Sequence, residues 1–131
     1  MRLLEIFARQ LCESARRISE LESRLEREEI RRVKELVEER FRDSSLQLDD
    51  AADCAGFSSA HFSHLFRKET GETFTRFVQS RRVAEARRLL SGTEKSVTEI
   101  CFACGFSNLT HFNRVFRSFE QMSPRAYRSH G

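Results

Sequence analysis

Two stretches of this 131-residue chain carry small, hydrogen-bonding and cationic side chains at helical spacing. The members of the two sets are Ala60, Ser63, His64 and Arg67, then Thr110, Asn113, Arg114 and Arg117. Because residues three and four apart share one face of an α-helix, each set would form one exposed helix face. Amide, hydroxyl, imidazole and guanidinium groups on such a face can bond base edges in a DNA major groove. The spacing therefore predicts two base-reading helices.

These side chains and their neighbours divide into base-reading and phosphate-contacting candidates. We expect base contacts from Ala60, Ser63, His64, Thr110, Asn113 and Arg114. Arg114 is the strongest of these candidates, because a guanidinium can donate two hydrogen bonds to O6 and N7 of guanine. Asn113 could read adenine or hold a phosphate, whereas Ala60 offers only a methyl contact. Phosphate contacts are expected at the helix starts and one turn past the bases, from Ser58, Ser59, Arg67, Lys68, Ser107, Asn108 and Arg117.

The two candidate helices lie in two copies of one unit, residues 48–68 and 97–117. A Gly-Phe-Ser turn occurs in both, at 56–58 and 105–107, and a His-Phe pair follows each turn. The offset is 49 up to the serines and 50 after them, so the second copy has one extra residue past its turn. A chain that repeats one unit in this way has two equivalent working surfaces.

Each copy is predicted to fold as a helix, a tight turn and a second helix. Ser96 and Glu99 have the spacing of a capping box, and a Gly is expected to end the first helix of each copy. Ser58 and Ser107 are expected to cap the second helices. Apolar residues at i, i+3 and i+4 predict a buried stripe on each second helix, formed by Phe62, Leu65 and Phe66, and by Phe112, Val115 and Phe116.

Together these features resemble the DNA-binding domain of the AraC/XylS family of bacterial transcription regulators. The resemblance covers roughly residues 31–129 and rests on both Gly-Phe-Ser turns, the two Phe-x-x-x-Phe-Arg segments, the connector from Arg81 to Leu90 and the final Ser-Pro-x-x-Tyr-Arg. One departure is Gln121, where the family usually has Gly. The resemblance implies an all-α fold, in which two helix-turn-helix subdomains are joined by a long connector helix and preceded by an amphipathic helix.

The resemblance also implies the domain plan and the function. An amphipathic, coiled-coil-like signalling or dimerisation helix is expected at 1–29. The double helix-turn-helix domain follows at 30–131, divided into 30–72, a connector at 73–91, and 92–131. The implied function is that of a sequence-specific, double-stranded DNA-binding regulator or activator of transcription, with two recognition helices in adjacent major-groove windows. Such a domain is usually the C-terminal part of a longer, ligand-responsive regulator, and RNA polymerase is an expected partner.

Residues 73–91 are expected to space the two reading heads. The seventeen residues from Phe74 to Leu90 would form a helical rod of roughly 25 Å. A rigid spacer of that size can hold two reading helices on successive major-groove windows, which lie about 34–36 Å apart. Its expected buried positions are Phe74, Phe77, Val78, Ala86, Leu89 and Leu90. Its arginines could touch phosphates or pair with carboxylates of the domain, namely Arg81, Arg82, Arg87 and Arg88.

Apolar residues also recur every seven positions near the N-terminus, at Leu4, Leu11, Ile18 and Leu25. Phe7 and Leu21 occupy d positions of the same heptads, whereas Ser14 and Glu28 weaken the seam. Two parallel helices could form Arg17–Glu22 and Arg24–Glu29 pairs across it and place two DNA-binding domains side by side on paired sites. A homodimer through residues 1–29 and packing against an upstream sensor domain both remain open. The phase of the stripe breaks before Ile30.

Composition and charge limit the other possible functions. The net charge is only +3, but the positive excess lies wholly in residues 57–131, which suits an anionic partner. No apolar run reaches about 18 residues and no signal peptide opens the chain, so no membrane partner and a cytoplasmic location are expected. A protein-interaction module is the alternative function, and steep salt dependence would favour DNA binding over it.

The sequence shows no catalytic constellation and predicts no cofactor. Cys101 and Cys104 have the spacing of half a zinc site, but no second pair follows. In the repeat they occupy the positions of Ala52 and Ala55, which indicates two small buried residues. His61 and His64 could share a metal on one helix face, yet no third ligand is placed. We therefore expect neither a metal site nor an enzyme.

Overall fold

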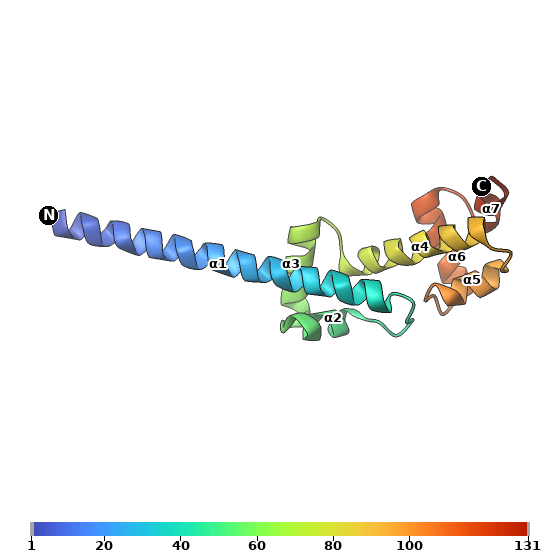
Figure 1. Cartoon of the computed structure of the whole chain (residues 1–131), viewed down its shortest axis with the longest axis horizontal. Coiled ribbons are helices and arrows are strands. Elements are labelled where there is room, and N and C mark those ends of the chain that lie inside the picture. The colour runs from blue at the N-terminus through green and yellow to red at the C-terminus, as the bar shows by residue number, and fades with distance from the viewer. Residues whose placement is uncertain (1, 131) are drawn as a thin grey trace.

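The computed structural model describes residues 2–130, which fold into seven helices and no strand (Figure 1). The helices are α1 (Arg2–Arg40), α2 (Leu48–Ala55), α3 (Ser59–Thr70), α4 (Phe74–Gly92), α5 (Val97–Ala103), α6 (Leu109–Glu120) and α7 (Pro124–His130). The predicted all-α class is confirmed. Met1 and Gly131, the outer ends of the two expected segments, lie outside the described residues.

Two separate apolar cores lie at the two ends of α4. The first joins the C-terminal part of α1 to α2, α3 and the start of α4, and the second joins the rest of α4 to α5, α6 and α7. Both predicted stripes of the second helices are buried in these cores. On α4, the expected core residue Phe77 is only half-buried, whereas Val83, which is not among the expected buried positions, is 1% exposed.

Helix α1 continues through the phase break without interruption. Its C-terminal part contributes Ile30, Val33 and Val37 to the first core. All side chains from Arg2 to Leu25 are exposed, because this part of the helix extends beyond the rest of the molecule (Figure 1).

The turns between helices follow the predicted chemistry with two corrections. The hydroxyl of Ser58 accepts a hydrogen bond from the His61 backbone N–H and caps α3. In the second copy the cap of α6 is Asn108 rather than Ser107, because the extra residue of this copy lies before the cap. Helix α5 ends at Ala103 with Cys104 rather than glycine as its C-cap, and the expected Gly105 follows directly with a φ of +100°.

The end of α1 meets the second subdomain at a close junction. Arg82 of α4 donates hydrogen bonds to the carbonyl oxygens of Phe41 (2.7 Å) and Asp43 (2.9 Å), and Arg42 pairs with Glu85 at 3.3 Å. A Cβ added to Gly105 would overlap the Phe41 carbonyl oxygen. This packing ties the two subdomains to each other in addition to their common helix α4.

Candidate DNA-binding interface

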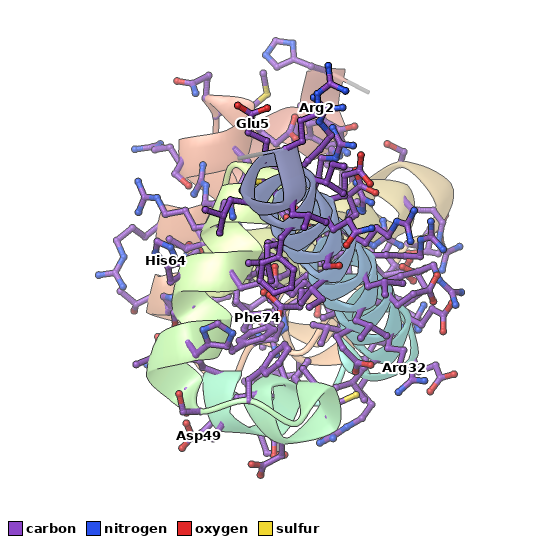
Figure 2. All side chains as sticks on the ribbon, turned by 90° about the vertical axis from the view of Figure 1, so that its left-hand side faces the viewer. Arg2, Glu5, Arg32, Asp49, His64 and Phe74 are labelled. Atoms are coloured by element: carbon purple, nitrogen blue, oxygen red, sulfur yellow. The ribbon has the colours of Figure 1, made fainter. Side chains whose placement is uncertain are left out.

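Helix α3 presents the first candidate reading face. Its buried side holds Phe62, Leu65 and Phe66, and this packing directs Ala60 and His64 to the exposed side and leaves Ser63 half-buried. Figure 2, which looks along the long axis of the molecule, shows His64 pointing sideways from that axis. The predicted residues of this copy therefore share one exposed helix face.

Helix α6 presents the second face in the same way. Phe112, Val115 and Phe116 are buried, and the predicted readers Thr110, Asn113 and Arg114 are exposed. Within residues 2–130 the Arg114 side chain forms no ion pair and no hydrogen bond, so its guanidinium is free to donate to a ligand.

The cationic phosphate candidates are equally available. Arg67, Lys68 and Arg117 are exposed, and none forms an ion pair or side-chain hydrogen bond with another residue of the described range. Their position in the last turns of α3 and α6 also places them where a helix dipole favours positive charge.

The polar phosphate candidates at the helix starts are more constrained. Ser58 and Asn108 use their side-chain oxygens to cap α3 and α6, which leaves a hydroxyl hydrogen and an amide NH₂ to donate. The Ser59 hydroxyl donates to the Asp49 carboxylate, so its hydrogen is occupied beside a negative charge. Ser107 is exposed but is not a cap. Ser59 is thus the weakest of the predicted phosphate contacts.

The connector arginines, in contrast, are engaged within the protein. Arg81 makes a two-pronged contact with Glu38 (2.8 and 2.6 Å), Arg87 pairs with Glu120 at 3.0 Å, and Arg88 pairs with Glu85 at 2.6 Å. Arg82 is held at the junction described above. Of the two interpretations left open by the sequence, pairing within the domain is therefore the one that the geometry supports.

A matching hollow adjoins each reading face. The first is lined by Ser63, His64, Arg67 and Thr73, among others, and the second by Asn113, Arg114, Arg117 and Ser123. These residues correspond one to one at the repeat offset of 50, and Thr73 caps the helix that follows α3. Thr73 and Ser123 were not selected from the sequence as site residues, although the repeat offset pairs them.

The two histidines that follow the turns act as scaffold side chains. His61 packs edge-on against Phe57 with ring centres 4.8 Å apart, and His111 packs against Phe106 at 5.7 Å. One further contact was missed: Arg76 of α4 lies over the Phe119 ring at 3.5 Å and donates to the Ser118 hydroxyl at 2.9 Å. It fixes the end of α6 against the connector.

The cysteine pair lies in the second core. Cys101 and Cys104 are fully buried, as the repeat predicts, and burial raises the pKa of the Cys104 thiol to about 12. Across residues 2–130 no group of three or more His, Cys, Asp or Glu side chains is placed to hold a metal ion. No helix in that range is long and apolar enough to cross a membrane.

Comparison with known proteins assigns this geometry to a class. Residues 51–130 match the family described as a helix-turn-helix domain. The crystal structure of the DNA-binding domain of AdpA, in complex with a target DNA, superposes with a TM-score of 0.72 at 29% identity, over 77% of this chain and 90% of that one. The C-terminal domain of the response regulator AraT from Geobacillus stearothermophilus gives 0.75 at 26% identity, over 79% and 85%. The fold is that of a DNA-binding domain with two helix-turn-helix units.

Sequence relatives specify the family. The transcriptional activator NphR of Rhodococcus sp is 36% identical over 101 residues, which cover 77% of this chain and 30% of that protein. The transposon Tn10 TetD protein of Escherichia coli is 36% identical over 86 residues, or 66% of this chain and 62% of that protein. The chain belongs to the AraC/XylS family of transcription regulators. It spans less than two thirds of the length of these relatives.

Proposed function

We propose that this chain binds specific sequences of double-stranded DNA, with α3 and α6 in adjacent windows of the major groove. The observation that carries the proposal is the pair of equivalent exposed faces, whose cationic side chains have no partner within the described chain. The 19 residues of α4 extend about 28 Å, which is compatible with the 34–36 Å between successive windows.

The proposed contacts are divided between base edges and phosphates. Arg114 donates to guanine, Asn113 reads adenine or holds a phosphate, and Thr110 contacts a neighbouring base. Ala60, Ser63 and His64 form the second and less discriminating set of base contacts. Arg67, Lys68 and Arg117 neutralise phosphates and set the register, supported by donors at Ser58, Ser107 and Asn108. Ser59 is retained only as a minor contact because its hydroxyl is engaged by Asp49.

The proposal extends to the biological role. The domain regulates transcription, as an activator, and works with RNA polymerase in the cytoplasm. It acts as the C-terminal part of a longer, ligand-responsive regulator with segments 1–29 and 30–131 as its signalling helix and DNA-binding domain. The greater length of the relatives and the name of the activator NphR support this part of the proposal.

A selection of bound sequences from random duplex DNA tests the proposal. The chain should enrich one site whose affinity falls steeply as salt is added, because each phosphate contact releases a counterion. Failure to enrich any sequence above the starting pool would reject sequence-specific binding. Weak, salt-insensitive association with protein partners alone would favour the interaction-module alternative.

A further inference from the structure

Arg76 in the first turn of α4 makes two contacts with the last turn of α6. Its guanidinium lies over the Phe119 ring, 3.5 Å from the ring centre, and donates a hydrogen bond to the Ser118 hydroxyl at 2.9 Å. That hydroxyl in turn donates to the Val115 carbonyl oxygen at 2.6 Å, so it serves as both donor and acceptor. A planar guanidinium that stacks on a ring and donates from its edge holds one defined orientation.

The two sides of this contact belong to different subdomains. Arg76 stands between Phe74 and Val78, which are buried in the first core, and its backbone N–H donates to the Thr73 cap at 3.1 Å. Phe119 is half-buried against the second core. The contact therefore joins the two subdomains, and we call it the Arg76 tie.

The first copy of the repeated unit has no equivalent of the Arg76 tie. Beyond the turns the offset between the copies is 50, so Phe119 corresponds to the exposed Glu69 and Ser118 to the exposed Lys68. The residue equivalent to Arg76 is an alanine. The first subdomain has its own core without such a contact. The tie is therefore not part of the shared fold of the unit, and its effect is on how the second unit sits relative to the first.

The Arg76 tie holds the opposite end of α6 from the junction described above. Near the start of α6, the Arg82 guanidinium lies 5.7 Å from the Phe106 ring centre, and Gly105 packs against the Phe41 backbone. The 12 residues of α6 separate these contacts from the tie by about 18 Å, and Figure 1 shows α6 crossing α4. A helix held at one end can pivot about that point, whereas a helix held at both ends keeps its tilt.

The tilt of α6 determines where the second reading face meets the DNA. Arg114 and Arg117 lie on the last two turns of α6, next to the tie. The Arg87–Glu120 pair also reaches this end of α6. Because Arg87 lies on the part of α4 that belongs to the second core, that pair does not orient α6 relative to the first subdomain.

We propose that Arg76 is a positioning residue for DNA recognition, which fixes the tilt of α6 and thereby sets the spacing between the two DNA windows that the chain accepts. This inference rests on the proposed DNA binding. One base pair inserted between the windows moves the second window by roughly 3.4 Å and turns it by roughly 35°. A chain with a fixed α6 binds such a duplex much less tightly, whereas a chain with a pivoting α6 can follow the shift.

Duplexes with altered spacing test the proposal, starting from the site enriched by selection. One variant duplex has a base pair inserted between the two halves, and two others have either half replaced by unrelated sequence. Arg76→Ala should weaken binding to the selected duplex by roughly three- to tenfold, because the tilt of α6 must then be ordered on binding. The insertion should weaken binding of this variant by a smaller factor than binding of the native chain. Binding to the duplex that keeps only the second half should be unchanged.

Two substitutions at Phe119 separate positioning from a phosphate contact of Arg76. Phe119→Leu removes the ring and leaves every charge in place, so it should give the same tolerance of the insertion as Arg76→Ala. Phe119→Tyr keeps the ring face and should retain the native dependence on spacing. A loss of affinity in Arg76→Ala, with the native spacing dependence in Phe119→Leu, would assign Arg76 to a phosphate and overturn the proposal.

The half-replaced duplexes separate the positioning role from the fold and from the proposed function. If Arg76→Ala also binds the second half alone more weakly, the tie supports the fold of α6 rather than its placement, and the proposal is overturned. An insertion penalty equal to that of the native chain would overturn it as well. If the native chain itself does not distinguish the selected duplex from the half-replaced ones, the proposed function fails, and not the positioning role alone.

Discussion

At the residue scale, the two reading faces differ in how sharply they can discriminate bases. The α6 face offers a free guanidinium and an amide, whose paired donors and acceptors match purine edges. The α3 face offers an imidazole, a half-buried hydroxyl and a methyl group, which suit several bases. The two copies of the repeated unit have equivalent folds, but most of the preference for particular DNA sequences should come from the second copy.

Arg114→Ala should therefore cost about 1–3 kcal/mol of binding free energy on the cognate site and relax preference at one base position. His64→Ala should cost less. Arg16→Ala removes the same charge from an exposed site on α1 and should leave the affinity nearly unchanged. Titrations on the cognate duplex and its single-base variants measure all three, and equal losses for Arg114→Ala and His64→Ala would contradict the ranking.

Gln121 is the one residue other than glycine with a positive φ in the described chain, at +63°. It ends α6 in the left-handed conformation, as Gly71 ends α3 at the equivalent position. Because that conformation strains a side chain bearing Cβ, Gln121→Gly should raise the free energy of unfolding by about 1 kcal/mol. Denaturant unfolding measures the change, and a destabilised variant would show that the Gln121 side chain contributes more than its strain costs.

The four cysteines should differ in reactivity. Cys12 and Cys54 are exposed, whereas burial raises the pKa of both Cys101 and Cys104. A raised pKa leaves less thiolate at neutral and mildly alkaline pH, and thiolate is the reactive form. Iodoacetamide should modify two thiols per native chain, with the other two following only on unfolding. Rapid modification of all four thiols in the native chain would show that the second core opens to solvent.

At the element scale, the repeat made much of the fold predictable. Helix periods, glycine stops and hydroxyl caps are local signals, and they placed α2, α3, α5 and α6 with their buried stripes. The Asn108 cap could also have been predicted from the sequence. Beyond the turn, equivalent residues of the two copies are 50 positions apart, and this offset pairs Asn108 with the cap residue Ser58. The Ser107 assignment failed because it kept the offset of 49.

Contacts between distant elements could not be predicted in the same way. Arg81 finds its carboxylate partner 43 residues away, at Glu38 on α1. That pairing depends on how α1 crosses α4, which neither helix specifies alone. The sequence therefore left the role of the connector arginines open. The stacking of Arg76 on Phe119 could not be predicted for the same reason, because it too joins two elements that are distant in the sequence.

The junction between α1 and the α5–α6 turn is the element most sensitive to a single methyl group. Gly105→Ala places a Cβ against the backbone at Phe41 and Arg42 in a conformation that alanine rarely adopts. The variant should lose several kcal/mol of unfolding free energy, of which the left-handed conformation alone accounts for about 1–2 kcal/mol. Gly92→Ala is the matched control, since nothing lies within 4 Å of its added Cβ. Thermal unfolding compares the two, and equal stability would contradict the close junction.

At the scale of the whole molecule, two small apolar cores lie at the two ends of α4 and hold the two reading faces in a fixed relative orientation. Helix α4 alone would allow the subdomains to twist, because they share few other elements. The Arg82 hydrogen bonds, the Arg42–Glu85 pair and the Gly105 contact resist that twist. Because the two reading faces are held in a fixed relative orientation, both can bind their major-groove windows on one DNA site without a further loss of conformational entropy.

The most direct test of simultaneous reading is a titration of the selected duplex with either half replaced by unrelated sequence. Two reading faces predict that replacement of either half weakens binding, with the larger loss in the half that Arg114 reads. In the Arg114→Ala chain, replacing that half should matter much less, while replacing the other half should matter as before. Equal affinity at physiological salt for the selected, the half-replaced and an unrelated duplex would contradict the account.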